Sequence, residues 1–306
     1  MRHRAHPPLT GGALDRDGAR RADQAALDTA WADPHARLLW LRGRDLPLAR
    51  RDATAAALHF TATLGERTAT HIYLGRDAHG PLFVRALDDA AGDVANEDQP
   101  IPAAGWANAL EIGALLDDDE AAVMAAALAI TAWHADAGFS ARDGAPTVPA
   151  LGGWARHDPH GGEHFPRTDP VVIVRIEHGD RVLLGSNALW ESGRFSLLAG
   201  FIDAGESAEA AVVREVAEEA GILVDRVQYL TSQPWPFPRS LMLGFRAQLA
   251  PGVDPASVVP EPGELSELRW FTREELRTPP PGIRLPGDMS IARWLIDEWI
   301  AEGSDD

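Results

Sequence analysis

The chain contains no cysteine among its 306 residues. Disulfides, thiolate metal sites and cysteine nucleophiles are therefore excluded together. No apolar run approaches the roughly 18 residues that a transmembrane helix needs, so no membrane partner is expected. The N-terminus also lacks the apolar core of a secretory signal. We expect about the first 20 residues to form a disordered tail and the protein to be cytoplasmic.

Positive charge is scarce as well. The 28 Lys and Arg residues stand against 46 Asp and Glu, which gives a formal net charge of −18. Binding along a nucleic-acid backbone needs clustered cations, so a broad nucleic-acid surface is excluded, although recognition of one nucleotide at an RNA end is not. The content of 45% hydrophobic and 24% charged residues is typical of a globular protein with room for two domains.

Acidic side chains gather in the segment GFIDAGESAEAAVVREVAEEAGI, residues 200–222. A helix is predicted from an N-cap at Ser207 to Gly221. Neighbouring positions i, i+3 and i+4 then hold three carboxylates on one face, those of Glu215, Glu218 and Glu219. The opposite face, expected to pack against a sheet, comprises Ala210, Val213, Ala217 and Ala220. Crowded carboxylates repel one another unless a cation lies among them, and an oxygen-only ligand set favours Mg²⁺ or Mn²⁺.

A solvated acidic helix face is the alternative interpretation of this segment. The flanking residues argue against it, because a glycine loop precedes the helix and Arg214 adjoins Glu215. The segment resembles the Nudix box, GX5EX7REUXEEXGU with U an aliphatic residue, and meets it at every fixed position. This resemblance implies an α/β protein with the Nudix fold, a mixed β-sheet sandwiched between helices in an α/β/α arrangement.

A second motif, SQPWPFPRS, occupies residues 232–240. Its three prolines exclude a regular helix or a central strand, so a stiffened loop that presents Trp235 and Phe237 is expected. An interaction ligand or a loop that only covers the core is the alternative. The motif is similar to SQPWPFPxS, the signature of the NADH pyrophosphatase (NudC) family, and it follows the box as it does there.

Three parts are expected along the chain. Residues 1–137 resemble the NudC N-terminal domain, an α+β scaffold, with strands at 58–64, 71–74 and 81–87 and a helical stretch over 106–136. Residues 138–167 are a connector rich in Gly and Pro. Residues 168–301 form the catalytic Nudix domain, with strands at 171–176, 181–184, 241–247 and 268–271 and a closing helix at 290–301.

The connector departs from the family pattern, which has a zinc ribbon of two CxxC pairs here. Alignment on Phe139 and Phe165 places Ser140, Asp143, His157 and His160 at the four cysteine positions. In one interpretation the structural zinc is lost and packing holds the connector. In the other, Asp143, His157 and His160 retain Zn²⁺ with a water molecule as the fourth ligand. Loss is favoured, because structural zinc sites are closed and rich in sulfur.

The resemblance also implies roles for individual residues. Two or more Mg²⁺ or Mn²⁺ ions would be held by Glu215, Glu218, Glu219, Glu264 and the carbonyl of Ala199. Glu215, Glu218 and Glu219 are the candidate catalytic residues, and spacing leaves open whether Glu218 or Glu219 is the base. Glu261 and Glu267 compete with Glu264 as the distant acid. Arg214 is expected to orient the carboxylates, and Glu206 to fix the loop.

Substrate recognition is expected in the aromatic loop and beside it. The resemblance implies contacts of a dinucleotide with Phe165, Phe201, Gln233, Pro234, Trp235, Pro236, Phe237, Pro238, Arg239, Ser240 and Ala292. Aromatic faces that stack on a base add about 1–3 kcal/mol per base. The family also implies a homodimer, with Phe165 donated across the subunit interface.

The leading hypothesis is metal-dependent hydrolysis of the diphosphate of NADH or NAD⁺, which gives AMP and the nicotinamide mononucleotide. The same bond in NAD-capped RNA 5′ ends is the second hypothesis. A broader hydrolase of ADP-ribose or dinucleoside polyphosphates remains an alternative. A nucleotide-sensing protein that has lost catalysis is another, although all three box glutamates are present and no basic helix-turn-helix is evident.

Overall fold

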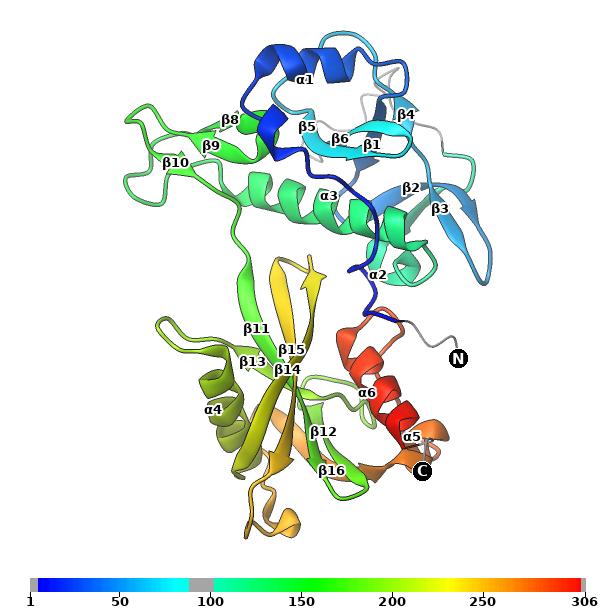
Figure 1. Cartoon of the computed structure of the whole chain (residues 1–306), viewed down its shortest axis with the longest axis vertical. Coiled ribbons are helices and arrows are strands. Elements are labelled where there is room, and N and C mark those ends of the chain that lie inside the picture. The colour runs from blue at the N-terminus through cyan, green and yellow to red at the C-terminus, as the bar shows by residue number, and fades with distance from the viewer. Residues whose placement is uncertain (1–4, 88–101, 304–306) are drawn as a thin grey trace. The chain divides into compact units, whose positions relative to one another are not determined.

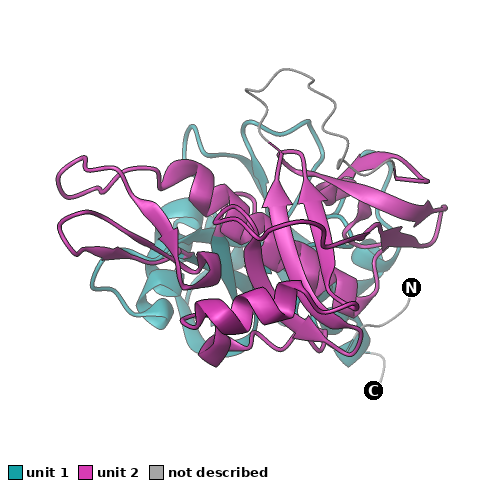
Figure 2. Cartoon of the chain, turned by 90° about the horizontal axis from the view of Figure 1, so that it is seen from above, with its two compact units in different colours: residues 1–10, 169–234, 240–306 teal, residues 11–168, 235–239 magenta. Residues whose placement is uncertain are grey.

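The computed structural model describes residues 5–87 and 102–303. They divide into two compact units, coloured teal and magenta in Figure 2. The C-terminal unit comprises residues 1–10, 169–234 and 240–306, and the N-terminal unit comprises residues 11–168 and 235–239. The chain passes between the units at Asp169, close to the expected start of the catalytic domain. The connector 138–167 lies within the N-terminal unit.

The C-terminal unit is built on one mixed sheet with the strand order β14-β15-β11-β12-β16, to which β13 adds by pairing with β11. Strand β11 runs parallel to β15 and antiparallel to β12 and β13. Its elements are β11 (Asp169–His178), β12 (Arg181–Asn187), β13 (Leu198–Phe201), α4 (Ala208–Ala220), β14 (Val224–Trp235), β15 (Ser240–Leu249), the 3₁₀ turn η3 (Pro255–Ser257), β16 (Leu265–Thr272), α5 (Arg273–Arg277) and α6 (Ile291–Glu302).

Alternating side chains of β11 divide the core into two layers. Val172 and Val174 pack in a cluster with residues of α4, whereas Ile173 packs in a second cluster with residues of α6. Successive side chains of a strand point to opposite faces, so the two helices must cover opposite faces of the sheet, as Figure 1 shows. The predicted sheet between helices is confirmed.

The proline-rich motif is a loop only in its middle. Ser232 to Trp235 form the end of β14, and residues 236–239 make the turn into β15. Proline was expected to exclude a central strand, and this expectation holds because β14 is the edge strand of the sheet. An edge strand leaves alternate N–H groups without a partner, so a proline such as Pro234 is tolerated there more readily than in a central strand.

The N-terminal unit contains three small sheets, with strand orders β4-β1-β6-β5, β3-β2-β7 and β10-β9-β8. The described residues include no helix long and apolar enough to span a bilayer. The elements are η1 (Gly18–Arg20), α1 (Gln24–Trp31), β1 (Arg37–Leu41), β2 (Asp45–Arg51), β3 (Ala56–Leu58), β4 (Thr61–Ala62), β5 (Ile72–Asp77), β6 (Gly80–Ala86), β7 (Trp106–Asn108), α2 (Ala109–Ile112), α3 (Asp118–Asp136), β8 (Val148–Ala150), η2 (Leu151–Gly153), β9 (Ala155–His157) and β10 (Glu163–His164).

Two of the predicted elements in this unit are wrong in their extent. The strand expected at 58–64 is two strands, because β3 pairs with β2 and β4 pairs with β1 of a different sheet. The helical stretch expected from 106 begins instead with β7, which pairs with β2. The helical part is also interrupted before α3, where Asp117 caps the helix by accepting a hydrogen bond from the backbone N–H of Glu120.

The segment 5–20 is not the disordered tail that its polar composition predicted; residues 1–4 lie outside the described part. The carbonyl of Pro8 accepts a hydrogen bond of 2.8 Å from the side-chain amide of Gln233. Asp15 and Arg76 exchange two backbone hydrogen bonds of 2.9 Å. The residues that order this segment lie far along the chain, so nothing near it in the sequence signals the order.

Hydrogen bonds hold the connector at the positions where the family has a ribbon. The Asp158 carboxylate accepts bonds of 2.9 Å from the backbone N–H groups of His160 and Gly162. It also pairs with the His164 ring at 3.0 Å. These hydrogen bonds lower the pKa of Asp158 to about 2, and the bond from Gly162 contributes most. Among the described residues no three His, Asp or Glu side chains, those of Asp143, His157 and His160 included, are grouped as metal ligands.

We expect the Asp158→Ala variant to unfold at a lower temperature than the wild type, because the turn loses three hydrogen bonds at once. Thermal unfolding followed by fluorescence measures this, and Glu66→Ala is the control because Glu66 is exposed. With Mg²⁺ kept in excess, the midpoint of the wild type should not change on addition of a zinc-selective chelator. One zinc per chain in elemental analysis would contradict this explanation of the connector.

Candidate active site

Helix α4 has the caps predicted for it. The Ser207 hydroxyl accepts a hydrogen bond from the backbone N–H of Ala210. At the other end Gly221 has φ of 66°, a left-handed conformation that glycine adopts without strain. Strand β13 directly precedes this helix in the chain, and the loop that connects them leads into the first turn of α4.

Ala220 is fully buried and Val213 is partly buried, as predicted, but the rest of the buried face of α4 differs from the predicted one. It is centred on Val212 and Val216, while Ala210 is exposed. Both sets of aliphatic residues satisfy the i, i+4 spacing, and the bulkier valines occupy the core because they bury more apolar area. The face is thereby turned by one position, and Glu219 becomes buried, with 4% of its surface exposed.

The Glu215 carboxylate lies against the backbone of Gly200 on β13. A Cβ atom at Gly200 would lie 1.9 Å from the Glu215 carboxyl carbon, so only glycine leaves room for this approach. The pKa of Glu215 is raised, mainly because the carboxyl group is partly buried. The sequence analysis did not identify Gly200 as a functional position. A glycine inside a strand is a usable signal, since it often marks the close approach of another group.

Arg214 forms ion pairs with three glutamates around the box loop. Its guanidinium donates to Glu206 at 2.7 Å, to Glu215 at 2.8 Å and to Glu218 at 3.1 Å. These hydrogen bonds raise the pKa of Arg214, and the bond to Glu206 contributes most. Glu206 in turn accepts the backbone N–H of Asp203, which fixes the loop. The predicted roles of Arg214 and Glu206 both agree with these contacts.

Glu219 lies outside the reach of this arginine. Its Oε2 atom is buried and has no hydrogen-bond partner. Burial is the first cause that raises its pKa to about 8, followed by the negative charges of Glu264, Glu215 and Glu218. Of the three candidate distant acids, Glu264 contributes to this shift, and neither Glu261 nor Glu267 is among its causes.

Backbone hydrogen bonds bring Glu264 to the end of α4. Val259 donates to the carbonyl of Ala220 at 2.9 Å, and Glu261 donates to the carbonyl of Glu219 at 3.1 Å. These bonds join the segment before β16 to the last turn of the helix. The sequence suggested this acid only by analogy, and the backbone contacts give the physical reason for its position.

The described residues include no three side chains already arranged around a metal position. The chemistry of the cluster nevertheless fits a hard divalent cation. The buried Glu219 oxygen without a hydrogen-bond partner and the negative charges of Glu264, Glu215 and Glu218 near it favour the binding of a positive charge. Glu215, Glu219, Glu264 and the Ala199 carbonyl, which precedes Gly200 on β13, are the residues that would hold Mg²⁺ or Mn²⁺.

We expect the metal-free protein to lose stability as the pH rises from 4.5 to 8. The pKa of Glu219 is raised from 4.5 to about 8 in the folded chain, so folding favours its protonated form. The stability from this proton is fully present below pH 4.5 and is lost as the pH rises through about 8. Urea unfolding in chelator at a series of pH values tests this, and an equal pH slope in Glu219→Gln would contradict it.

Two residues expected to contact substrate are instead part of the core. Gln233 is fully buried, and its amide donates to the carbonyls of Pro8 and Met289 at 2.8 and 2.9 Å. Its Oε1 accepts the backbone N–H of Ile291 at 2.9 Å. Ala292 is 2% exposed and packs in the α6 core cluster. Both side chains are used by the fold, so neither faces a ligand.

The other expected substrate residues are distributed over both units. Phe201 and Ser240 belong to the C-terminal unit, where Ser240 begins β15 and pairs with Asp169. Trp235 and Phe237 belong to the N-terminal unit and pack edge to face, with ring centres 5.1 Å apart. The exposed aromatic rings of the expected set are those of Phe165 and Phe201. Pro234 is half-buried at the end of β14, and the turn that follows contains Pro236, Pro238 and Arg239.

Comparison with known proteins identifies the family. Residues 166–294 match the NUDIX domain. The NAD-capped RNA hydrolases NudC of Mycobacterium bovis and Mycobacterium tuberculosis are each 39% identical to this chain over 312 residues, which cover 97% of this chain and 96% of theirs. The protein of the same name from Stutzerimonas stutzeri is 36% identical over 229 residues, 74% of this chain and 76% of its own.

A crystal structure of a NUDIX hydrolase from Nitrosomonas europaea covers 48% of this chain and 96% of its own, with 22% identity and a TM-score of 0.38, too low to add to the assignment. The mycobacterial relatives decide it, because they match almost the whole chain and not only the box. The protein therefore belongs to the NudC family of Nudix hydrolases.

Proposed function

We propose that this protein hydrolyses the central diphosphate of NADH or NAD⁺ to AMP and the nicotinamide mononucleotide, using Mg²⁺ or Mn²⁺. We include the same bond at NAD-capped RNA 5′ ends, since the mycobacterial relatives are named for that substrate. The observation that carries the proposal is the buried, unpaired Glu219 oxygen among three other carboxylates. The net charge of −18 favours recognition of the cap over recognition of the RNA chain.

The residues of the cluster take different parts in this reaction. Divalent cations, when bound, would neutralise charge on the phosphoryl oxygens. Glu219, buried and with an oxygen that has no hydrogen-bond partner, is the group that we assign to accept the proton of the attacking water. Glu215 is held beside Gly200 by Arg214. The more exposed Glu218 is paired with the same arginine, so we assign it a positioning role.

The experiment compares kcat/KM for NADH, NAD⁺, NAD-capped RNA, ADP-ribose and a dinucleoside polyphosphate. Chromatography measures AMP from the free nucleotides, and from the capped RNA it measures the nicotinamide mononucleotide, because the adenosine phosphate stays on the RNA. Reactions contain Mg²⁺, Mn²⁺ or a chelator. The Glu209→Gln variant is a matched control, because Glu209 lies in the first turn of α4 and is exposed. A higher kcat/KM for ADP-ribose than for every NAD substrate would replace the proposal with the broader hydrolase. No turnover of any substrate would favour a sensor without catalysis.

We further propose that the protein is a homodimer in the cytoplasm. Large apolar side chains are exposed in the connector, where Phe139, Val148 and Phe165 are 70%, 62% and 53% accessible. Neighbouring exposed apolar residues favour a protein interface. Light scattering coupled to gel filtration measures the mass, and a monomer at micromolar concentration would reject the dimer.

A further inference from the structure

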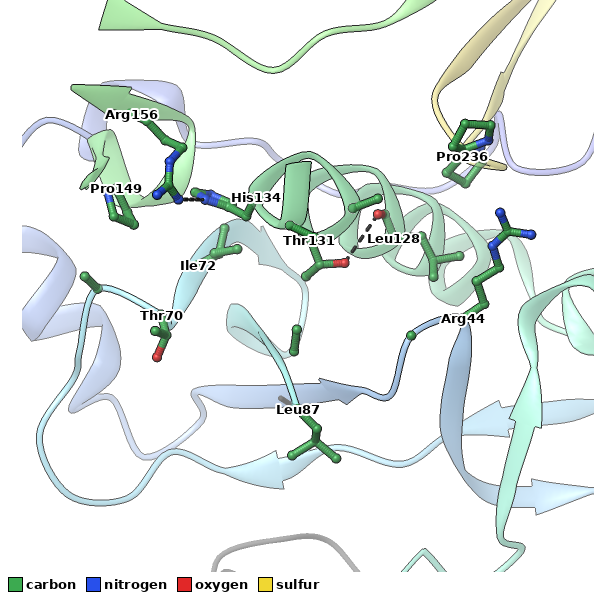
Figure 3. Close-up of a pocket in the computed structure, with 16 residues that line it drawn as sticks. Arg44, Thr70, Ile72, Leu87, Leu128, Thr131, His134, Pro149, Arg156 and Pro236 are labelled. Carbon is green, nitrogen blue, oxygen red and sulfur yellow. Dashed lines mark hydrogen bonds between the residues drawn. The ribbon is translucent and has the colours of Figure 1, made fainter. Parts of the chain in front are cut away.

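The N-terminal unit contains a cavity of about 560 Å³, and none of the residues that line it belongs to the carboxylate cluster. Its volume is in the range of small-molecule sites. Helix α3 forms one wall, and β5, the end of β6 and the turn of the SQPWPFPRS motif contribute the others, as Figure 3 shows. Its apolar lining includes Ile72, Leu87, Leu128, Pro149, Pro236 and Pro238.

One end of the cavity holds an arginine in a fixed orientation. Arg156 donates from Nε to the Thr147 hydroxyl at 2.7 Å and from Nη2 to the Thr147 carbonyl at 2.9 Å. Its Nη1 donates to Nδ1 of His134 at 2.8 Å, a contact drawn in Figure 3. His134 Nε2 donates to the carbonyl of Gly153 at 2.7 Å, so the ring is neutral and oriented. Burial, which lowers the pKa of His134, favours the same form.

The charge of Arg156 is not neutralised by the described residues. A guanidinium has five N–H donors, and three are engaged in the bonds to Thr147 and His134, so two remain. The described residues include no acidic partner for it, and no Asp or Glu lines the cavity. Burial lowers the pKa of Arg156, as expected for a cation without a counter-ion.

A second arginine lies at the opposite end of the cavity. Arg44 appears in Figure 3 on the side of Leu128 and Pro236, away from His134 and Arg156. Its guanidinium lies 5.8 Å from the centre of the Phe237 ring and has no acidic partner in the described part of the chain. Cationic ends with an apolar middle form a site that is complementary to an anion with an apolar body.

We propose that this cavity binds a small organic anion, with its carboxylate, sulfonate or phosphate on Arg156 and its apolar body against Ile72, Leu128 and Pro236. The oriented guanidinium keeps one unused donor on Nη1 and one on Nη2, which suit an anionic group with two or more oxygen atoms. The fixed geometry lowers the ordering cost of binding. None of the box glutamates lines this cavity. A test of anion binding is therefore independent of a test of the hydrolase proposal.

The test uses two fluorescent probes that differ only in charge. Anilinonaphthalene sulfonate carries a sulfonate on two apolar ring systems, and phenylnaphthylamine is the same molecule without the sulfonate. We expect the sulfonate to bind the full-length protein at one site per chain and at least about tenfold more tightly than the uncharged probe. Arg156→Gln should weaken sulfonate binding by about tenfold and leave binding of phenylnaphthylamine unchanged.

Further variants separate binding from folding. Arg44→Gln alters an exposed side chain and should also weaken the sulfonate selectively, whereas Ala135→Trp at the cavity wall should weaken both probes. Arg142→Gln is the control, because Arg142 is exposed in the same unit and does not line the cavity. Thermal midpoints confirm that each variant is folded. Equal affinity for the two probes, or sulfonate binding unchanged in both Arg156→Gln and Arg44→Gln, would overturn the proposal.

Discussion

The Glu219→Gln variant is expected to lose about a thousandfold in kcat on NADH while it remains folded. A positioned general base contributes about 10²–10⁴ in rate, and the amide of glutamine cannot accept the proton of the attacking water. Glutamine has nearly the shape of glutamate, so the packing of the α4 end should be kept. Steady-state kinetics with Mg²⁺ measures the loss.

The same variant should be more stable than the wild type when no divalent cation is present. The wild-type carboxylate is buried without a hydrogen-bond partner and is repelled by Glu264, Glu215 and Glu218. A neutral amide removes that repulsion, so the thermal midpoint above pH 8 should rise. Mg²⁺ should then raise the midpoint of the wild type more than that of the variant.

Glu209→Gln controls for the loss of one negative charge on the same helix, and it should change neither kcat nor the midpoint. Opposite changes in activity and stability distinguish a functional carboxylate from a structural one. If Glu219→Gln kept full activity, or if it lost activity and stability together, Glu219 would not be the catalytic base.

The box helix could be predicted because everything that defines it is local. The cap at Ser207, the left-handed Gly221 and the spacing of the three glutamates all lie within 15 residues of sequence, Ser207 to Gly221. The contact of Arg214 with Glu218 was predictable for the same reason, since side chains four residues apart on a helix are neighbours. Local chemistry therefore identified most of the carboxylate cluster.

What was missed depends on partners that are distant in sequence. Gln233 was expected to touch substrate, but it joins Pro8, Met289 and Ile291, which are 56 or more residues away. The helical spacing of aliphatic residues in α4 was compatible with two different buried faces. Packing against the sheet determines which of the two is buried. In the N-terminal unit, the separation of β3 from β4 followed from pairing with two different sheets. Such choices are made by tertiary contacts.

Gly200→Ala should reduce kcat by about a hundredfold without destabilising the protein. The new methyl group would lie 1.9 Å from the Glu215 carboxyl carbon and 2.1 Å from its Oε2, so the carboxylate must move. The carboxylate is the end of a flexible side chain, and its displacement costs the fold little. A misplacement of about 1 Å can lower a rate by about 10².

The backbone at Gly200 does not require glycine for its own conformation, because its φ lies outside the left-handed region. Alanine in a strand is favoured over glycine by about 0.5–1 kcal/mol, so the thermal midpoint should stay equal or rise slightly. Gly287→Ala is the matched control, since a Cβ there meets no atom within 4 Å. That variant should keep full activity.

A double variant tests whether the methyl group acts through Glu215 alone. In the Glu215→Gln background the carboxylate has already been removed, so adding Gly200→Ala should lower kcat no further. Such non-additivity is the signature of two changes that act on one contact. If the two losses multiplied instead, Gly200 would act on the reaction by another route, such as a shift of the adjacent Ala199 carbonyl. A hundredfold loss shared by both variants would place the Glu215 carboxylate, pressed against β13, among the groups on which turnover depends.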